Sequence, residues 1–322
     1  MTTTGALPAA QLLRARTAVV VAFITAGLAF SSFIARAPAL RDSLGLSTAQ
    51  LGLLLLCMSG GAVAGLPLSG PIVHRLGPGR AVLSGALSMT VGLALLSVGM
   101  FAEFVPIAAL GLFATGLGTG VWDVAMNVEG ADVERRLGRS LMPRLHAAFS
   151  LGTVAGAGVG AACAALGVPL PAQLVGIVVL LPIVVMPAVR RFLPVQEAAP
   201  DEPRSGSGVL AAWREPRTIV VGLMVLAFAF TEGSANDWIA IAMVDGHGTS
   251  ETLGAVAFGF FVAAMTAGRM AGGAALERFG RVVVVRTTAV IALAGLLLML
   301  LGGSVPVASP ARCCGGWGRS RR

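Results

Sequence analysis

Charge is scarce in this chain, and lysine and tyrosine do not occur in it. Charged residues make up 12% and hydrophobic residues 56% of the 322 residues, and the mean hydropathy is +0.86. A typical soluble domain carries about 25% charged residues, so this composition cannot cover a surface that faces water. The sequence excludes a soluble globular protein and predicts that lipid surrounds much of the chain.

Residues that carry catalysis are also rare. Of the four cysteines, Cys57 and Cys163 lie in apolar segments and Cys313 and Cys314 are adjacent, which is not the spacing of a disulfide framework. The three histidines are far apart, and the sequence holds no Ser/His/Asp arrangement, metal-ligand cluster or Walker-type phosphate loop. We therefore expect neither an enzyme nor an ATP-driven pump, and no cofactor or metal ion.

Apolar stretches long enough to cross the roughly 30 Å of bilayer hydrocarbon, which takes about 20 helical residues, recur along the chain. We expect nine spans, at about 17–38, 50–73, 81–101, 104–128, 146–167, 169–190, 218–243, 254–276 and 282–303. Arg14 and Arg16 precede the first span as in a signal peptide, but its apolar core is too long and eight further spans follow. The predicted fold class is an all-α membrane protein.

The arginines predict how the chain is oriented. With the N-terminus in the cytoplasm, the cytoplasmic connections hold sixteen arginines, whereas the opposite side holds only Arg36 and Arg41 before residue 303. Arginine is enriched in cytoplasmic loops of membrane proteins, so we expect a multi-pass protein of the cytoplasmic (inner) membrane. The net charge of +8 does not indicate nucleic-acid binding, because it is spread over short loops.

The last residues break this pattern. The segment "SPARCCGGWGRSRR" (309–322) adds four arginines on the side expected to face outward, and no further span follows it. We interpret residues 305–322 as an aberrant tail that results from truncation or a change of reading frame near residue 305. A short natural tail is the alternative.

Two short segments, both expected on the cytoplasmic side, resemble each other 203 residues apart: "GPIVHRLGPGR" (70–80) and "GAALERFGRVV" (273–283). Both fit the pattern Gly-x-x-x-(acid)-Arg-x-Gly, which predicts a tight glycine-rich loop with an arginine near the lipid headgroups. The matching residues are Gly70, His74, Arg75, Gly77 and Arg80 in the first copy and Gly273, Glu277, Arg278 and Gly280 in the second.

This repeated pattern resembles the signature loop of the major facilitator superfamily, which occurs between helices two and three and again between helices eight and nine. The first copy departs from it, since His74 stands where the family has an acid. The segments "ARAPALRDSLGLSTAQLG" (35–52), "GVWDVAMNVEGADVERRLGRSLMPRLHAAFSLG" (120–152) and "TEGSANDWIAIAM" (231–243) are similar to YbjJ-type bacterial inner-membrane proteins and, more distantly, to fucose-proton symporters.

The resemblance implies two six-helix bundles around a central cavity, with alternating access by rocking. The chain supplies one complete bundle and about three helices of a second. The expected domains are a cytoplasmic N-terminus (1–16), the N-terminal bundle (17–192), a cytoplasmic linker (193–216), a partial C-terminal bundle (217–304) and the aberrant tail (305–322).

Polar residues inside the expected spans are candidate site residues, because ionisable groups at membrane depth are costly. Asp123 and Asn127 share one helix face, and the resembling symporters carry an acid and an asparagine at this spacing. The alternative is an acid that reaches the interface or pairs with Arg144. His146 opens the next span and is a candidate proton relay to Asp123, or a histidine that is hydrogen-bonded at a helix start.

Glu232 lies near the middle of the seventh span, followed by Gly233, Ser234 and Asn236. Glycine and serine there permit local unwinding, as in the broken helices that frame substrate sites, and the segment itself offers no neutralising partner for Glu232. A packed, protonated acid is the alternative. Arg269 is expected to extend toward the cytoplasmic headgroups.

Arg36 and Asp237 form the expected outer gate. The repeat offset places Asp237 opposite the end of the first span, within one turn of Arg36, and an ion pair between them would close the outer side. The alternative is two independent interfacial charges, with Trp238 as an aromatic anchor.

These observations predict a secondary active transporter, a monomer in membrane lipid, that moves a small solute with protons by alternating access. The polar cavity residues suit either a sugar or a small organic cation. A transport-inactive truncated product and a membrane scaffold or sensor are the alternative interpretations.

Overall fold

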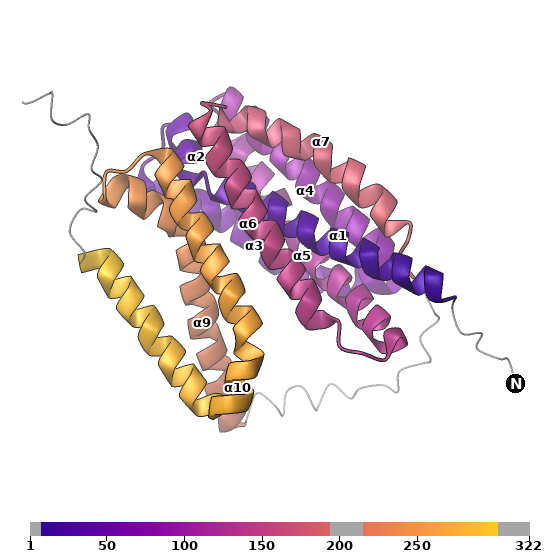
Figure 1. The fold of residues 1–322 in the computed structure, drawn as a ribbon. Helices are drawn as coiled ribbons and strands as arrows, with labels where there is room; N and C mark the ends of the chain where they lie inside the picture. The colour runs from indigo at the N-terminus through magenta and orange to yellow at the C-terminus, as the bar shows by residue number, and fades with distance from the viewer. Residues whose placement is uncertain (1–7, 194–214, 302–322) are drawn as a thin grey trace, which may run out of the picture.

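The computed structural model describes residues 8–193 and 215–301, and every regular element in these ranges is a helix (Figure 1). The predicted linker and tail therefore lie almost wholly outside the described residues. The elements are α1 (Ala9–Ile34), α2 (Ala37–Ser43), α3 (Thr48–Leu76), α4 (Pro78–Phe101), α5 (Val105–Leu137), α6 (Met142–Ala165), α7 (Leu170–Val189), α9 (Pro216–Ile241), η1 (Ala242–Gly246) and α10 (Glu251–Leu301).

The described residues contain nine helical segments that are long and apolar enough to cross a membrane. This number confirms the all-α membrane fold expected from the sequence. Helix α10 supplies two of these segments, Glu251–Gly272 and Ala274–Met299, and its backbone departs from helical geometry at Gly280. We call residues 251–279 its first limb and residues 281–301 its second limb.

Successive long helices run antiparallel, so their ends gather at two levels. We call one level the α2 end, which holds α2, η1 and the turn at residues 166–169, and the other the linker end, which holds Leu193 and Glu215 next to the linker. Helices α1 to α7 form one bundle, and α9 and α10 lie beside it (Figure 1). The bundle packs through α1 with α6, α3 with α5, and α4 with α5 and α7, while α10 packs on α6.

Glycines bring the helices of the first bundle into backbone contact. A Cβ atom on Gly61 of α3 would lie 2.0 Å from the Phe113 carbonyl oxygen, and one on Gly116 of α5 would lie 1.9 Å from the Met58 carbonyl oxygen. Such close approach through small residues is typical of helices packed within membranes, where dispersion contacts drive association.

We expect Gly61→Ala to destabilise the bundle by about 1–3 kcal/mol, the usual cost of overpacking. The matched control is Gly60→Ala, because a Cβ at Gly60 meets no atom within 4 Å and alanine is the better helix former by about 1 kcal/mol. Thermal unfolding of both purified variants, followed by size-exclusion chromatography, measures the difference. Equal melting temperatures for the two variants would contradict the packing seen between α3 and α5.

Acidic residues of α5 hold the linker end of the first bundle together. The buried Glu129 accepts a hydrogen bond from the Leu193 backbone N–H (2.7 Å) after α7. Glu134 accepts hydrogen bonds from the backbone N–H groups of Leu141 (2.5 Å) and Met142 (2.7 Å), which lie at the start of α6. The sequence did not single out these contacts, which join α5 to the ends of its neighbours.

The two similar segments at 70–80 and 273–283 are mainly helical, not the loops expected from their glycines. Helix α3 continues to Leu76, and only Gly77 breaks the path to α4. Gly77 (φ 79°, ψ 160°) and Gly280 (φ 76°, ψ 160°) adopt the same backbone conformation, which is essentially restricted to glycine. A single residue therefore makes each turn, and the two turns are alike in geometry as well as in sequence.

Candidate functional site

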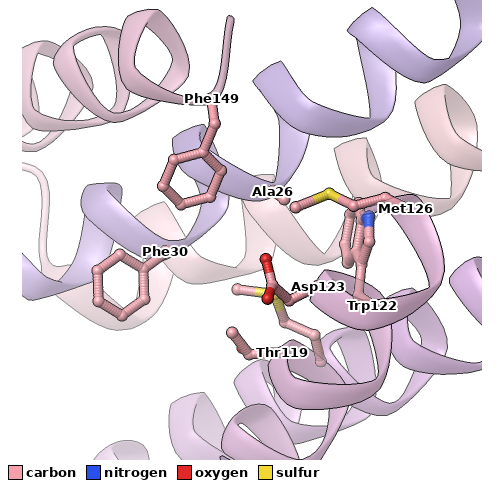
Figure 2. Close-up of a pocket in the computed structure, with 8 residues that line it drawn as sticks. Ala26, Phe30, Thr119, Trp122, Asp123, Met126 and Phe149 are labelled. Atoms are coloured by element: carbon pink, nitrogen blue, oxygen red, sulfur yellow. The ribbon is translucent and has the colours of Figure 1, made fainter. Parts of the chain in front are cut away.

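An open cavity of about 160 Å³ lies between α1, α4, α5 and α6 of the first bundle, and the Asp123 side chain that lines it is exposed (Figure 2). Its lining residues are Ala26, Phe30, Met89, Thr119, Trp122, Asp123, Met126 and Phe149. Asp123 is the one ionisable residue among them, and Figure 2 shows its carboxylate pointing toward the rings of Phe30 and Phe149. The cavity thus combines a single carboxylate with walls made of aromatic rings and thioethers.

Asn127 is held against Asp123 by the helix they share. Its side-chain amide donates to the Asp123 backbone carbonyl (2.8 Å) and to the Asp123 carboxylate (3.3 Å). His146 lies on α6 with its ring edge-on to Phe23, at 5.7 Å between centroids. The structure thus brings Asp123 and Asn127 into direct contact, whereas His146 does not line the cavity. In the described ranges no ion pair links Asp123 to Arg144.

The buried side chain of Trp122 adds an unused hydrogen-bond donor to this region. Its indole Nε1 has no hydrogen-bond partner among the described residues, and the side chain is 1% exposed. An unsatisfied buried donor costs free energy, and because the Nε1 atom has almost no accessible surface, a ligand reaches it only if the surrounding side chains move.

Glu232 has a cationic partner that the sequence did not identify. Arg269, on the first limb of α10, donates to the Glu232 carboxylate (2.8 Å) and to the hydroxyl of the buried Ser150 on α6 (3.2 Å). The expectation that Arg269 extends to the headgroups is therefore wrong. Its guanidinium instead links α9, α10 and the first bundle.

Helix α9 is continuous past Glu232, so the local unwinding that Gly233 and Ser234 would permit does not occur there. The departure from α-helical geometry comes later, where η1 begins at Ala242. Asn236 is half-buried one turn beyond Glu232. A turn of π-helix often marks a functional position, and η1 carries Asp245, whose contact is described below.

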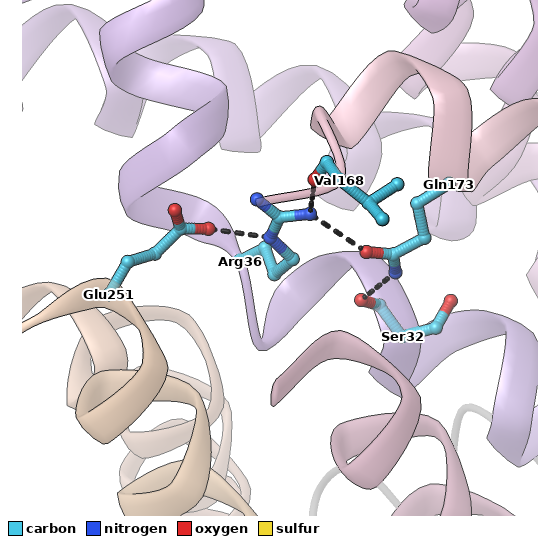
Figure 3. Close-up of polar contacts among 5 residues, drawn as sticks. All are labelled: Ser32, Arg36, Val168, Gln173 and Glu251. Carbon is cyan, nitrogen blue, oxygen red and sulfur yellow. Dashed lines mark hydrogen bonds and ion pairs between the residues drawn. The ribbon is translucent and has the colours of Figure 1, made fainter. Parts of the chain in front are cut away.

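Arg36 is the centre of a polar cluster at the α2 end (Figure 3). Its guanidinium donates to the Glu251 carboxylate (2.5 Å), the Val168 carbonyl oxygen (2.7 Å) and the Gln173 side-chain oxygen (3.1 Å). Gln173 in turn donates to the Ser32 carbonyl oxygen (2.8 Å). Arg36 is only 4% exposed and Glu251 is 32% exposed, so this cluster joins α1, α7 and α10 around a buried guanidinium whose acidic partner reaches the surface.

The partner of Arg36 differs from the one expected. Asp237 is half-buried on α9 and is not paired with Arg36 in the structure, which places Glu251 there. The repeat offset aligned α9 with α1 but took no account of η1 and the turn after it, which carry the first turn of α10 to Arg36. Glu251 directly precedes an apolar span, and from sequence it is indistinguishable from an acid at a helix start.

A second ion pair lies beside this cluster, between Arg41 of α2 and Asp245 of η1. Arg41 also contacts Asp42 at 2.8 Å. The hydrogen bonds that Asp245 and Asp42 accept raise the pKa of the Arg41 guanidinium above its ordinary value, so it stays charged throughout the physiological pH range. Two ion pairs therefore connect the first bundle to the α9–α10 hairpin at the α2 end, and none of the first eighteen residues of α9 (216–233) is buried.

Comparison with known proteins places this arrangement in a family. The sequence profile of the Major Facilitator Superfamily matches residues 18–316. The chain belongs to the major facilitator superfamily. This membership confirms the resemblance noted from the two glycine turns, and it makes the chain a membrane transport protein, not an enzyme. No solved structure matches it.

Relatives of this superfamily member come from several bacteria. A Sinorhizobium fredii protein named "Uncharacterized transporter y4wD" is 29% identical over 92% of this chain and 77% of its own length. A Yersinia pestis protein named "Uncharacterized MFS-type transporter" is 30% identical over 81% of this chain and 66% of its own length. "Membrane protein MosC" of Rhizobium meliloti is 25% identical over 88% of this chain and 67% of its own length.

The residues that resemble the superfamily's signature loop lie at the linker end. His74, Arg75 and Arg80 surround the first glycine turn and are exposed, as are Glu277 and Arg278 before the second. Gly70 and Gly273 lie inside α3 and α10. Three residues join the first bundle to the α9–α10 hairpin: Ser150, Glu251 and Asp245. None of them lies in the two similar segments at 70–80 and 273–283, and their role is known only from their contacts in the structure.

Proposed function

We propose that this member of the superfamily is a secondary active transporter that moves a small solute across the cytoplasmic membrane by alternating access, driven by protons. The observation that carries the proposal is the contact of Glu232 with Arg269, because the same guanidinium reaches Ser150 on the first bundle. A proton on Glu232 removes the charge that holds Arg269. Proton binding to Glu232 then changes the equilibrium between arrangements of the α9–α10 hairpin relative to the first bundle.

The arginine distribution supports a cytoplasmic N-terminus, which places the α2 end outside the cell. The Arg36–Glu251 and Arg41–Asp245 pairs then close the outer side, and the unburied first half of α9 faces the cytoplasm. We assign this conformation to the inward-facing state of a monomer. Opening outward requires both ion pairs to separate, and water then solvates each charged group in place of its ionic partner.

The remaining polar residues have subordinate roles in this proposal. Asp123, with Asn127 beside it, contacts the solute, and His146 relays protons toward that carboxylate. Asn236 lies on the same face of α9 as Glu232 and hydrogen-bonds the solute. Arg36 gates the outer side through Glu251, and Asp237 takes over as its partner while the gate opens.

A substrate-independent assay tests the transport proposal. Proteoliposomes that contain an internal pH dye are exposed to pools of metabolites, and a transported solute shifts the dye signal as protons move with it. We expect Glu232→Gln to reduce this proton movement at least about tenfold, since glutamine mimics the neutral acid and carries no proton. Glu215→Gln, at the exposed start of the same helix, is expected to leave it unchanged.

Solute exchange separates coupling from folding in the same vesicles. Exchange of internal for external solute requires no net proton movement, so Glu232→Gln is expected to retain it. If no pool moves protons through the unaltered protein, the proposal fails and a scaffold or transport-inactive product takes its place.

A further inference from the structure

We propose that the solute is a small organic cation whose charged group pairs with Asp123 in the cavity of the first bundle. The inference rests on the transport function proposed above, but the binding step can be tested without it. Three properties of the cavity carry it: its uncompensated charge, the chemistry of its walls and its size.

The first property is charge. Asp123 is the one ionisable residue that lines the cavity, and in the described ranges no cationic side chain pairs with it. Arg269 is bound to Glu232, and His146, whose ring packs against Phe23, is near Asp123 but neither forms an ion pair with it nor lines the cavity. Asn127 supplies one neutral donor to the Asp123 carboxylate. Asp123 is exposed in the open cavity, so a ligand can reach it, and a cationic ligand supplies the counter-charge that the apolar walls do not.

The second property is the wall around that carboxylate. Phe30, Trp122 and Phe149 contribute aromatic rings, and Met89 and Met126 contribute thioethers. The faces of aromatic rings attract alkylammonium groups electrostatically, and this attraction grows when the site excludes water. Methionine is polarisable and adapts to irregular ligand shapes. These walls suit a cation that carries its charge on a nitrogen surrounded by carbon.

The same wall argues against a sugar, the other solute class suggested by the sequence. The only hydroxyl group in the lining is that of Thr119, and it already donates to the Thr115 carbonyl oxygen (2.8 Å). A polyol would bring several hydroxyl groups into the cavity with Asp123 as their main partner. Buried polar groups without partners cost more than the pairs that form, so the cavity disfavours polyols.

The third property is size. The cavity has a volume of about 160 Å³, and an apolar protein cavity of about 150 Å³ accommodates a benzene molecule. The ligand part that enters it therefore has roughly six or seven non-hydrogen atoms. Choline fits this description, and 3,3-dimethylbutan-1-ol is its neutral isostere, in which a carbon atom replaces the charged nitrogen.

Binding of this matched pair to the purified chain in nanodiscs tests the inference. We expect choline to bind at least about tenfold more tightly than 3,3-dimethylbutan-1-ol, and Asp123→Asn to remove that preference. The control variant is Glu103→Gln, which removes an exposed acid in the turn before α5 and is expected to leave both affinities unchanged. Retained binding of the neutral isostere by Asp123→Asn shows that the variant is folded.

Three results would overturn the inference. They are equal affinity for choline and its isostere, choline binding that is unaffected by Asp123→Asn, and the absence of choline binding to the unaltered protein. The vesicle assay gives an independent answer on transport. If choline binds through Asp123 but moves no protons, the cation site is supported and the proposed proton coupling is contradicted. If only neutral solutes move protons, the proton coupling is supported and the cation site is contradicted.

Discussion

Arg36→Ala is expected to open the α2 end of the molecule and to raise the outside accessibility of the cavity by about thirtyfold or more. Removing one member of a buried, hydrogen-bonded charge pair costs about 2–5 kcal/mol, and every 1.4 kcal/mol is a factor of ten. Arg36 is 4% exposed and satisfies Glu251, Val168 and Gln173 together. Without the Arg36 guanidinium, these acceptors have no hydrogen-bond donor in the closed arrangement, whereas in the open arrangement water donates to them.

The measurement uses Thr119→Cys as a reporter in the cavity, in a background that lacks the four native cysteines. A membrane-impermeant thiol reagent added outside labels the reporter at a rate proportional to the fraction of open molecules. Labelling in right-side-out vesicles is compared with and without Arg36→Ala. The predicted quantity is the labelling rate of the Arg36→Ala protein divided by that of the protein with Arg36.

Arg41→Ala is the matched control, because its ion pair with Asp245 lies at the same end but closer to solvent. The Arg41 and Asp245 side chains are 14% and 38% exposed, against 4% and 32% for Arg36 and Glu251, so we assign the Arg41 pair about 1 kcal/mol, the upper end for exposed pairs. Its loss is expected to raise labelling by less than about sixfold. Equal effects of the two substitutions would show that burial of Arg36 does not determine the closed state.

The spans and the paired glycines could be predicted from sequence because their signals are local. Hydropathy over about 20 residues identifies a span, and a glycine such as Gly77 or Gly280 marks a change of direction whatever its neighbours are. Asp123 and Asn127 were placed together by helix periodicity alone, and the structure gives the distances that their spacing implies.

The pairings between helices could not be predicted, because they depend on how segments far apart in the chain are set against each other. Glu251 contacts Arg36 across 215 positions, and the five residues of η1 determine which acid arrives there. Arg269 has an ordinary place near a helix end in the sequence, and only the packing of α10 on α6 brings it to Glu232. The closure of the α2 end is thus a property of tertiary geometry.

Arg269→Gln is expected to reduce proton-driven solute accumulation by about fivefold, because an ion pair whose side chains are 41% and 45% exposed contributes about 1 kcal/mol at most. The guanidinium is the one group that contacts both the Glu232 carboxylate and the Ser150 hydroxyl. Without it, the charge on Glu232 no longer changes the contact between the hairpin and the first bundle. Proton binding then loses its influence on the opening equilibrium.

The double variant Arg269→Gln/Glu232→Gln distinguishes coupling from a general loss of fold. Removing both charges leaves no unpaired ion in the membrane, so solute exchange is expected to recover toward the unaltered rate while accumulation stays low. Arg286→Gln is the control, since Arg286 is an exposed arginine on the second limb of α10. Accumulation that survives Arg269→Gln at the unaltered level, or a double variant that accumulates solute normally, would show that protons do not act through the Glu232–Arg269 pair.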